Sequence, residues 1–186
     1  MIEHQKVVHH RIAKAAAFGA SSGFVATWAI TILLVASEVE MGFPEGTFYT
    51  IIGIVLGMHG SDATYLGFGL HLLTGTLIGV ASSPLLAFVT RHGTSLYKCV
   101  GMGLGVGFVV WLVLFLPITI FGVQPAMHEI IISVSVTAER MMLAEQIVQM
   151  TSVILISAVV YHLVYGAILG YMSGLLIQKI EVITKV

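Results

Sequence analysis

Two histidines, His71 and His162, lie inside long apolar stretches of the sequence, where ionisable side chains are rare. Neutral imidazole is the commonest metal ligand in proteins. His59 and Asp62 are close to the first of these stretches and would extend the donor set to nitrogen and oxygen ligands that suit zinc or copper. The sequence therefore predicts His59, Asp62, His71 and His162 as candidate metal ligands, and a haem held by His71 and His162 is a second candidate cofactor.

Two other interpretations of the same residues are open. In the structural one, each histidine is neutral and hydrogen-bonded to a Ser, Thr, Tyr or carbonyl group on a neighbouring helix, a contact that contributes ~0.6 kcal/mol on average. Thr27, Thr31 and Thr119 are candidate polar neighbours. In the transport interpretation, Asp62, His71 and His162 form a path for protons or a small solute.

The composition identifies the solvent of this chain and excludes several classes of function. Its 186 residues are 58% hydrophobic and 9% charged, whereas soluble domains carry about 25% charged residues. A lipid bilayer must therefore surround most of the chain. The net charge of −1 argues against nucleic-acid binding. The sequence contains no legible Ser/His/Asp constellation and no phosphate-binding glycine loop, so no such motif indicates an enzyme.

Four apolar runs are long enough to cross about 30 Å of hydrocarbon. They cover residues 15–37, 63–90, 99–122 and 151–178. Residues 48–58 are too few to span the membrane, so we predict an interfacial or re-entrant helix there. Residues 123–150 mix apolar and polar side chains and are predicted to form a helix on the outer membrane surface. The predicted fold is an all-α membrane four-helix bundle that makes up a single domain, residues 1–186.

The charged residues predict the orientation of this bundle. Seven of the eight basic residues lie in 1–14, 91–98 and 179–186, and Arg140 is the exception. By the positive-inside rule these three segments are cytoplasmic. The sequence thus predicts a multi-pass protein of the cell membrane with both termini in the cytoplasm. Seven acidic residues then fall on the outer side: Glu38, Glu40, Glu45, Asp62, Glu129, Glu139 and Glu145.

An internal similarity predicts two tandem two-helix repeats. Residues 71–82 align with residues 162–173, with five of twelve positions identical, and the histidines are among the matches. The first and third runs share two glycines spaced by four, Gly19 and Gly23 before Trp28, and Gly103 and Gly107 before Trp111. Glycines at this spacing let helix backbones approach closely. In such a repeat, His71 and His162 would face each other across a pseudo-twofold axis.

The chain resembles a family of small, uncharacterised four-span membrane proteins frequent in archaea. The resemblance rests on the run 19–37, the loop 38–58 and the closing segment 162–170, and covers most of the chain. It implies a membrane location and four helices, but no activity. His71 and the segment 123–150 lie outside the family's pattern.

The glycine faces and the outer amphipathic segment favour one function over the others. We expect a non-catalytic membrane component that self-associates or joins a larger membrane complex, with the lipid bilayer as its surroundings. The alternatives are a metal- or haem-binding protein that uses His71 and His162, and a small-solute or proton transporter or channel.

Overall fold

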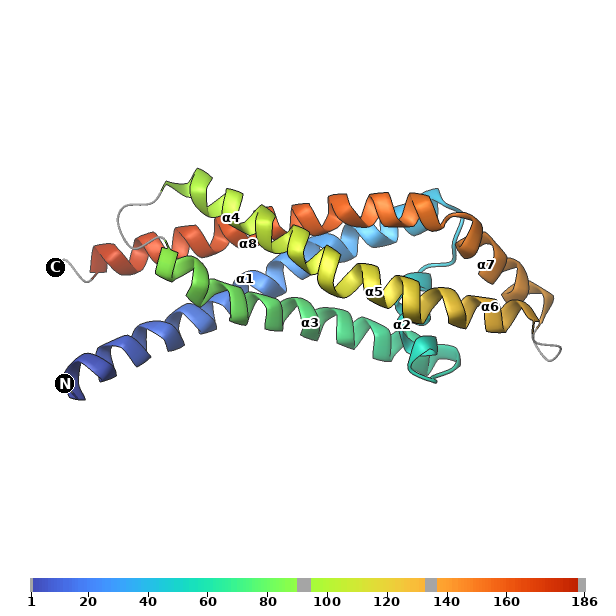
Figure 1. Ribbon diagram of the computed structural model, residues 1–186, viewed down its shortest axis with the longest axis horizontal. Helices are drawn as coiled ribbons and strands as arrows, with labels where there is room; N and C mark the ends of the chain where they lie inside the picture. The colour runs from blue at the N-terminus through green and yellow to red at the C-terminus, as the bar shows by residue number, and fades with distance from the viewer. Residues whose placement is uncertain (1, 90–94, 133–136, 184–186) are drawn as a thin grey trace. The chain divides into compact units, whose positions relative to one another are not determined.

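The computed structural model describes residues 2–89, 95–132 and 137–183, and within them the side chains of 12–87, 95–132 and 137–176. The chain is all-α over this part, with no strand. Four helices are long and apolar enough to cross a membrane, over Ile12–Glu40, Gly60–Ala87, Leu96–Ile132 and Thr151–Leu176. Figure 1 shows them as α1, α3, the series from α4 to α6, and α8. The predicted fold class is confirmed.

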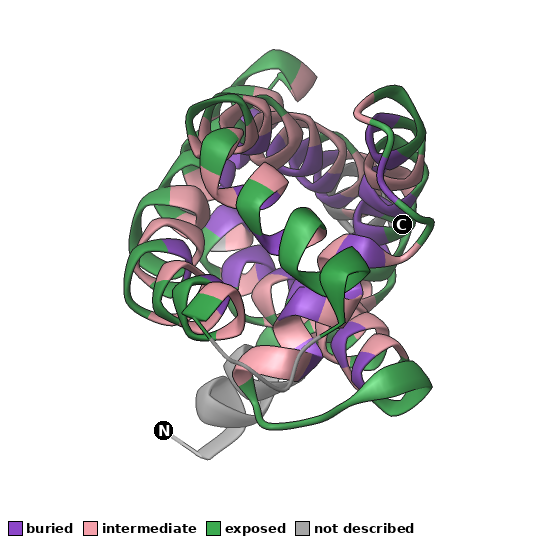
Figure 2. Cartoon of the chain, turned by 90° about the vertical axis from the view of Figure 1, so that its right-hand side faces the viewer, coloured by how far each residue is buried: buried purple, intermediate pink, exposed green. Residues whose placement is uncertain are grey.

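Two of the long helices, α3 (Gly60–Val89) and α8 (Thr151–Ile183), lie within about five residues of the predicted runs 63–90 and 151–178. The first, α1 (Ile2–Glu40), covers the predicted run 15–37 but begins 13 residues before it. Exposed and buried residues lie on different sides of the long helices (Figure 2), and the exposed sides carry many large apolar residues. This is the pattern of helices whose outer faces meet lipid. The four apolar faces therefore make this a membrane-embedded protein.

The third long helix extends ten residues further than predicted. It consists of α4 (Leu96–Val110), η1 (Trp111–Phe115), α5 (Leu116–Ile118), η2 (Thr119–Val123) and α6 (Gln124–Ile132) without a break. The two π-helical turns flank Pro117, whose missing N–H interrupts the α-helical hydrogen bonds. Its 37 residues measure about 55 Å at ~1.5 Å per residue. Part of it must therefore lie beyond the hydrocarbon.

The segment predicted as one surface helix, 123–150, contains two helices. The first is α6, and the second is α7 (Ala138–Gln149), which packs against α6. The predicted short helix at 48–58 is α2 (Thr47–Val55). These short helices share a hydrophobic core of Phe43, Ile51, Met127, Ala144 and Ile147.

The chain forms two compact units, and every long helix contributes to both. Unit 1 contains residues 1–30, 72–108 and 162–186, and unit 2 contains residues 31–71 and 109–161. The units divide the predicted histidine pair. His71 is the last residue of its segment in unit 2, and His162 is the first residue of its segment in unit 1.

Within unit 1, helices meet at glycines. A Cβ atom added to Gly23 of α1 would lie 2.6 Å from the carbonyl oxygen of Gly75 and 3.0 Å from the Cα of Gly79, both in α3. A Cβ atom on Gly103 of α4 would lie 2.8 Å from the Cα of Gly170 in α8. These distances leave no room for a side chain, so backbone lies against backbone at both crossings.

Two buried hydrogen bonds join these helix pairs. The Tyr165 hydroxyl of α8 donates to the carbonyl oxygen of Gly75 in α3 at 2.6 Å. The hydroxyl groups of Ser83 and Ser173 lie 3.0 Å apart. Both contacts are buried, where a polar group without a partner is costly. They therefore hold α3 and α8 together within unit 1.

We predict that Gly103→Ala destabilises the protein by about 1–3 kcal/mol, because the added methyl group meets the Gly166 backbone and forces the helices apart. Gly69→Ala is the matched control, since a Cβ on Gly69 has no atom within 4 Å. Its effect should stay within about 0.5 kcal/mol. Unfolding of both variants in detergent micelles measures this, and equal stabilities would show that the crossing is not tight.

Candidate functional site

Polar side chains from three helices converge in unit 2. Thr31 comes from α1, Tyr49 from α2 and His71 from α3. Thr31 and Tyr49 are buried, and the Nε2 atom of the half-buried His71 is buried as well. The Tyr49 ring lies 5.4 Å from the His71 ring and 5.3 Å from the Phe68 ring, measured between centroids. Thr31, Tyr49 and His71 are hereafter called the polar cluster.

Backbone contact between α2 and α3 positions Tyr49. Gly53 of α2 lies against the backbone of Ala63 in α3, so any side chain at 53 would collide with it. A Cβ atom on Gly67 of α3 would lie 3.1 Å from the Cα of Tyr49. The hydroxyl groups of Thr50 and Thr64 are 2.6 Å apart and join the same two helices. Tyr49 is therefore carried by a helix that is firmly attached to α3.

Glu38, near the end of α1, caps the start of α2. Its carboxylate is fully buried and accepts hydrogen bonds from the backbone N–H groups of Gly46 and Phe48, each at 2.7 Å. The N-cap residue is Gly46, with φ 83°, and it has no side chain that could cap the helix. Glu38 supplies this function from α1, and its negative charge faces the positive end of the α2 dipole.

The environment of Tyr49 keeps its hydroxyl group protonated. Burial raises the pKa of Tyr49 above its ordinary value. Interaction with the Thr31 side chain opposes part of this rise, and the nearby Glu38 charge adds to it. The phenol is therefore a neutral hydrogen-bond donor at physiological pH. With Thr31 and His71 beside it, the cluster is suited to hydrogen bonding with a small polar group.

The predicted metal ligands are distributed over both units. His59 lies just before α3 and Asp62 lies in its first turn, and both are exposed. His162 is half-buried in unit 1. In the part of the chain that the structure describes, no group of three or more His, Cys, Asp or Glu residues is placed to hold a metal ion. Metal or haem binding by His71 and His162 stays a prediction.

Sequence reasoning found part of this site and missed part of it. It named His71 as a candidate and Thr31 as a polar neighbour, and both belong to the polar cluster. The other two threonines donate within their own helices, Thr27 to the Gly23 carbonyl at 2.6 Å and Thr119 to the Phe115 carbonyl at 2.9 Å. Tyr49 was not predicted, and Glu38 was assigned only to the outer charge pattern. No local motif marks either residue.

Comparison of this chain with protein-family models, with curated proteins and with solved structures gave no match. Membership of the archaeal membrane protein family that the sequence resembles therefore stays a prediction.

We predict that Glu38→Ala loosens the start of α2. The variant loses two hydrogen bonds to a charged acceptor, each worth about 1.5–3 kcal/mol. The amide hydrogens of Gly46 and Phe48 should then exchange with solvent faster than in the parent protein. Glu40→Ala removes an exposed carboxylate of the same helix and should leave both exchange rates unchanged. Protected amides in Glu38→Ala would show that α2 starts without this cap.

Proposed function

We propose that this protein is a non-catalytic membrane component that assembles with a second copy of itself through the third long helix. The observation that carries the proposal is an open glycine face on α4. Gly101 and Gly105 are exposed, lie four residues apart, and a Cβ atom on either would have no other atom within 4 Å.

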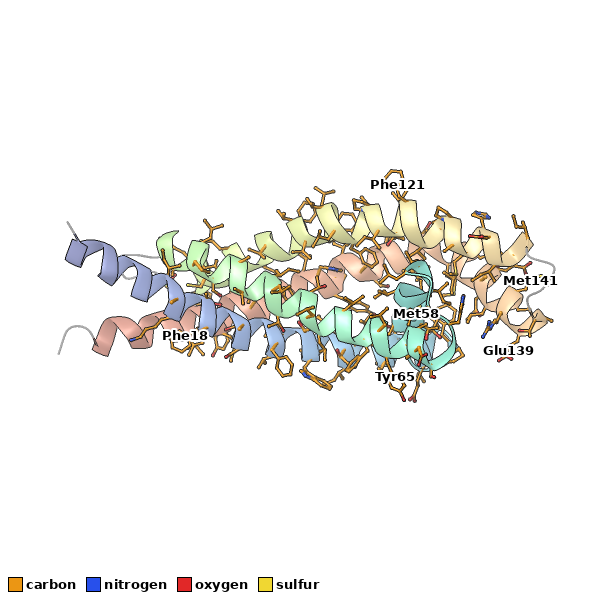
Figure 3. All side chains as sticks on the ribbon, turned by 90° about the horizontal axis from the view of Figure 1, so that it is seen from below. Phe18, Met58, Tyr65, Phe121, Glu139 and Met141 are labelled. Carbon is orange, nitrogen blue, oxygen red and sulfur yellow. The ribbon has the colours of Figure 1, made fainter. Side chains whose placement is uncertain are left out.

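The third long helix is the least buried of the four over the residues that the structure describes. In its most apolar 18-residue stretch 11% is buried, compared with 39% in the first long helix and 28% in each of the other two. Its exposed large apolar residues run from Tyr97 to Ile132, and Phe121 among them points outward in Figure 3. Lipid covers such a surface well, so exposure alone does not indicate a partner. Association in lipid needs faces that allow close packing.

Two glycine faces lie on nearly opposite sides of α4. Gly103 and Gly107 pack against α8 within the chain. Gly101 and Gly105 are displaced from them by two residues, which is about 200° around a helix. The chain already uses this spacing to bring two helix backbones into contact. A second copy would supply an identical open face, so the pair could form a symmetric dimer.

The contacts within unit 1 also support the proposal that the chain is built from two similar halves. Gly23 meets the Gly75 carbonyl and the Gly79 Cα, and Gly103 meets the Gly166 carbonyl and the Gly170 Cα. Since 75 and 79 align with 166 and 170, Gly23 corresponds to Gly103. The glycines before Trp28 and Trp111 instead predict that Gly19 corresponds to Gly103 and Gly23 to Gly107. The contacts shift this alignment by four residues, or one helical turn.

The distribution of charge supports the proposed orientation. The segments of unit 1 contain seven basic and two acidic residues, a formal charge of +5, and those of unit 2 contain one basic and seven acidic residues, a formal charge of −6. Together these make the −1 of the chain. We infer a cell-membrane protein in which the basic segments 1–14, 91–98 and 179–186 face the cytoplasm, with both termini inside. The side chains of Lys6, Arg11, Arg91, Lys179 and Lys185 lie outside the described residues.

We predict that the parent protein is dimeric in liposomes and that Gly105→Ile weakens the dimer about tenfold or more, because a branched side chain keeps the two helices apart. Single-molecule photobleaching at graded protein-to-lipid ratios measures the dissociation constant. Gly69→Ile is the control, since Gly69 is an exposed glycine of α3 with equally open surroundings.

A parent protein that stays monomeric at all ratios would refute self-association. A dimer that resists Gly105→Ile would place the interface elsewhere. Association with other membrane polypeptides through this face would instead identify the chain as a subunit of a larger complex, and that complex should then be sensitive to the same substitution.

The orientation makes a separate prediction. The native thiol of Cys99 is unsuitable for labelling, because it is buried against Gly174. In a Cys99→Ser background, Glu139→Cys should react with a membrane-impermeant maleimide on intact cells. Tyr97→Cys, at a position that is 89% exposed, should react only after the membrane is opened. The reverse pattern would invert the topology.

A further inference from the structure

The hydroxyl group of Tyr49 is buried without a hydrogen bond of ordinary geometry. Tyr49 is 4% exposed, and its oxygen is buried with no hydrogen-bond partner within the usual distance and angle. The Thr31 side chain of α1 is close enough to lower the pKa of the phenol, but the two hydroxyl groups do not form a well-aligned hydrogen bond. Among the tyrosines of the described chain, Tyr165 is the contrasting case, since its buried hydroxyl donates to a backbone carbonyl at 2.6 Å.

A buried phenol in this state calls for an additional partner. Buried polar groups in proteins almost always bond to protein or to ordered water. The phenol is kept neutral by its surroundings, so it offers one donor as well as acceptor capacity. The simplest molecule that satisfies such a group is one able both to accept and to donate.

The surroundings of Tyr49 set the size and chemistry of that molecule. The rings of Phe68 and His71 lie beside the phenol, and the Nε2 atom of His71 is buried there too. Backbone contacts at Gly53 and Gly67 hold α2 directly against α3, which favours a ligand no larger than a water molecule. Buried waters typically make about three hydrogen bonds to such polar groups. A hydroxyl group and an imidazole can supply the remaining two.

We propose that the polar cluster binds one internal water molecule, which accepts a hydrogen bond from the Tyr49 hydroxyl and has Thr31 and His71 as its other polar neighbours. A cation fits the cluster less well, because Thr31 and Tyr49 are neutral donors and acceptors rather than anionic ligands. The inference is independent of the proposed self-association. It gives His71 a role in a hydrated polar site.

Water-edited solid-state NMR of the parent protein in liposomes tests the proposal. With carbon-13-labelled tyrosine, the rate at which water magnetisation reaches each ring reports its distance from water. Three tyrosines can be assigned without mutation, because Phe48–Tyr49, Thr64–Tyr65 and Tyr165–Gly166 are each unique as residue pairs in this sequence. Buried Tyr165, whose hydroxyl donates to a backbone carbonyl, is the dry reference.

If the water is present, the transfer rate at Tyr49 should be clearly faster than that at Tyr165, although both side chains are buried. A rate close to that at Tyr165 would overturn the proposal.

Tyr49→Phe supplies a second measurement with opposite signs for the two cases. Loss of a hydrogen bond to water should lower the melting temperature by about 2–4 °C. Removal of a dry, unsatisfied hydroxyl group should raise it instead, which would also refute the proposal. Tyr65→Phe is the control. It should leave the melting temperature unchanged, because the Tyr65 side chain is exposed and its hydroxyl group is not part of a buried contact.

Discussion

Lipid provides no hydrophobic force that presses one transmembrane helix against another. The helices of unit 1 are held together instead where glycines let their backbones touch, at Gly23 and Gly79 on one side and at Gly103 and Gly170 on the other. Dispersion contacts accumulate at such crossings because the helix axes come close together. The hydrogen bonds of Tyr165 with Gly75 and of Ser83 with Ser173 then join one of these helix pairs to the other, through α3 and α8. The rest of unit 1 depends on this close approach.

Unit 2 is stabilised in a different way. Its irregular segments have backbone groups that no helix satisfies, and these groups need partners wherever water is excluded. Side chains from distant positions supply them. Glu38 bonds to the start of α2, and the Gln146 amide donates to the Met41 carbonyl at 3.0 Å. The shared core around Met127 adds apolar burial, as in a soluble domain.

Close packing of helix backbones at glycines also explains why α4 is the best candidate for an interface. A helix with glycines on one side is needed to close the chain's own bundle, and α4 has them at Gly103 and Gly107. Glycines on its other side have no such purpose within the chain, and they reduce helix propensity at Gly101 and Gly105. A second helix against this face would give them a role comparable to that of the first pair.

The sequence by itself determined the solvent, the number of long helices and the fold class. Hydrophobic length alone decides whether a segment can cross a bilayer, and length is read directly from the chain. It also separated the short α2 from the spanning helices. The extension of the third helix to Ile132 was missed, because the polar residues that follow Gly122 mark the end of a membrane span and not the end of a helix.

Only the tertiary structure decided which polar residues meet. Glu38 looks like any exposed acid in the sequence, and its burial depends on a loop that turns α2 back toward the end of α1. Tyr49 approaches His71 because Gly53 and Gly67 allow α2 to lie directly on α3. Such contacts join residues through the geometry of packed backbones. Composition and spacing do not encode that geometry, because a glycine or a carboxylate has the same identity whether it faces lipid, water or a neighbouring helix.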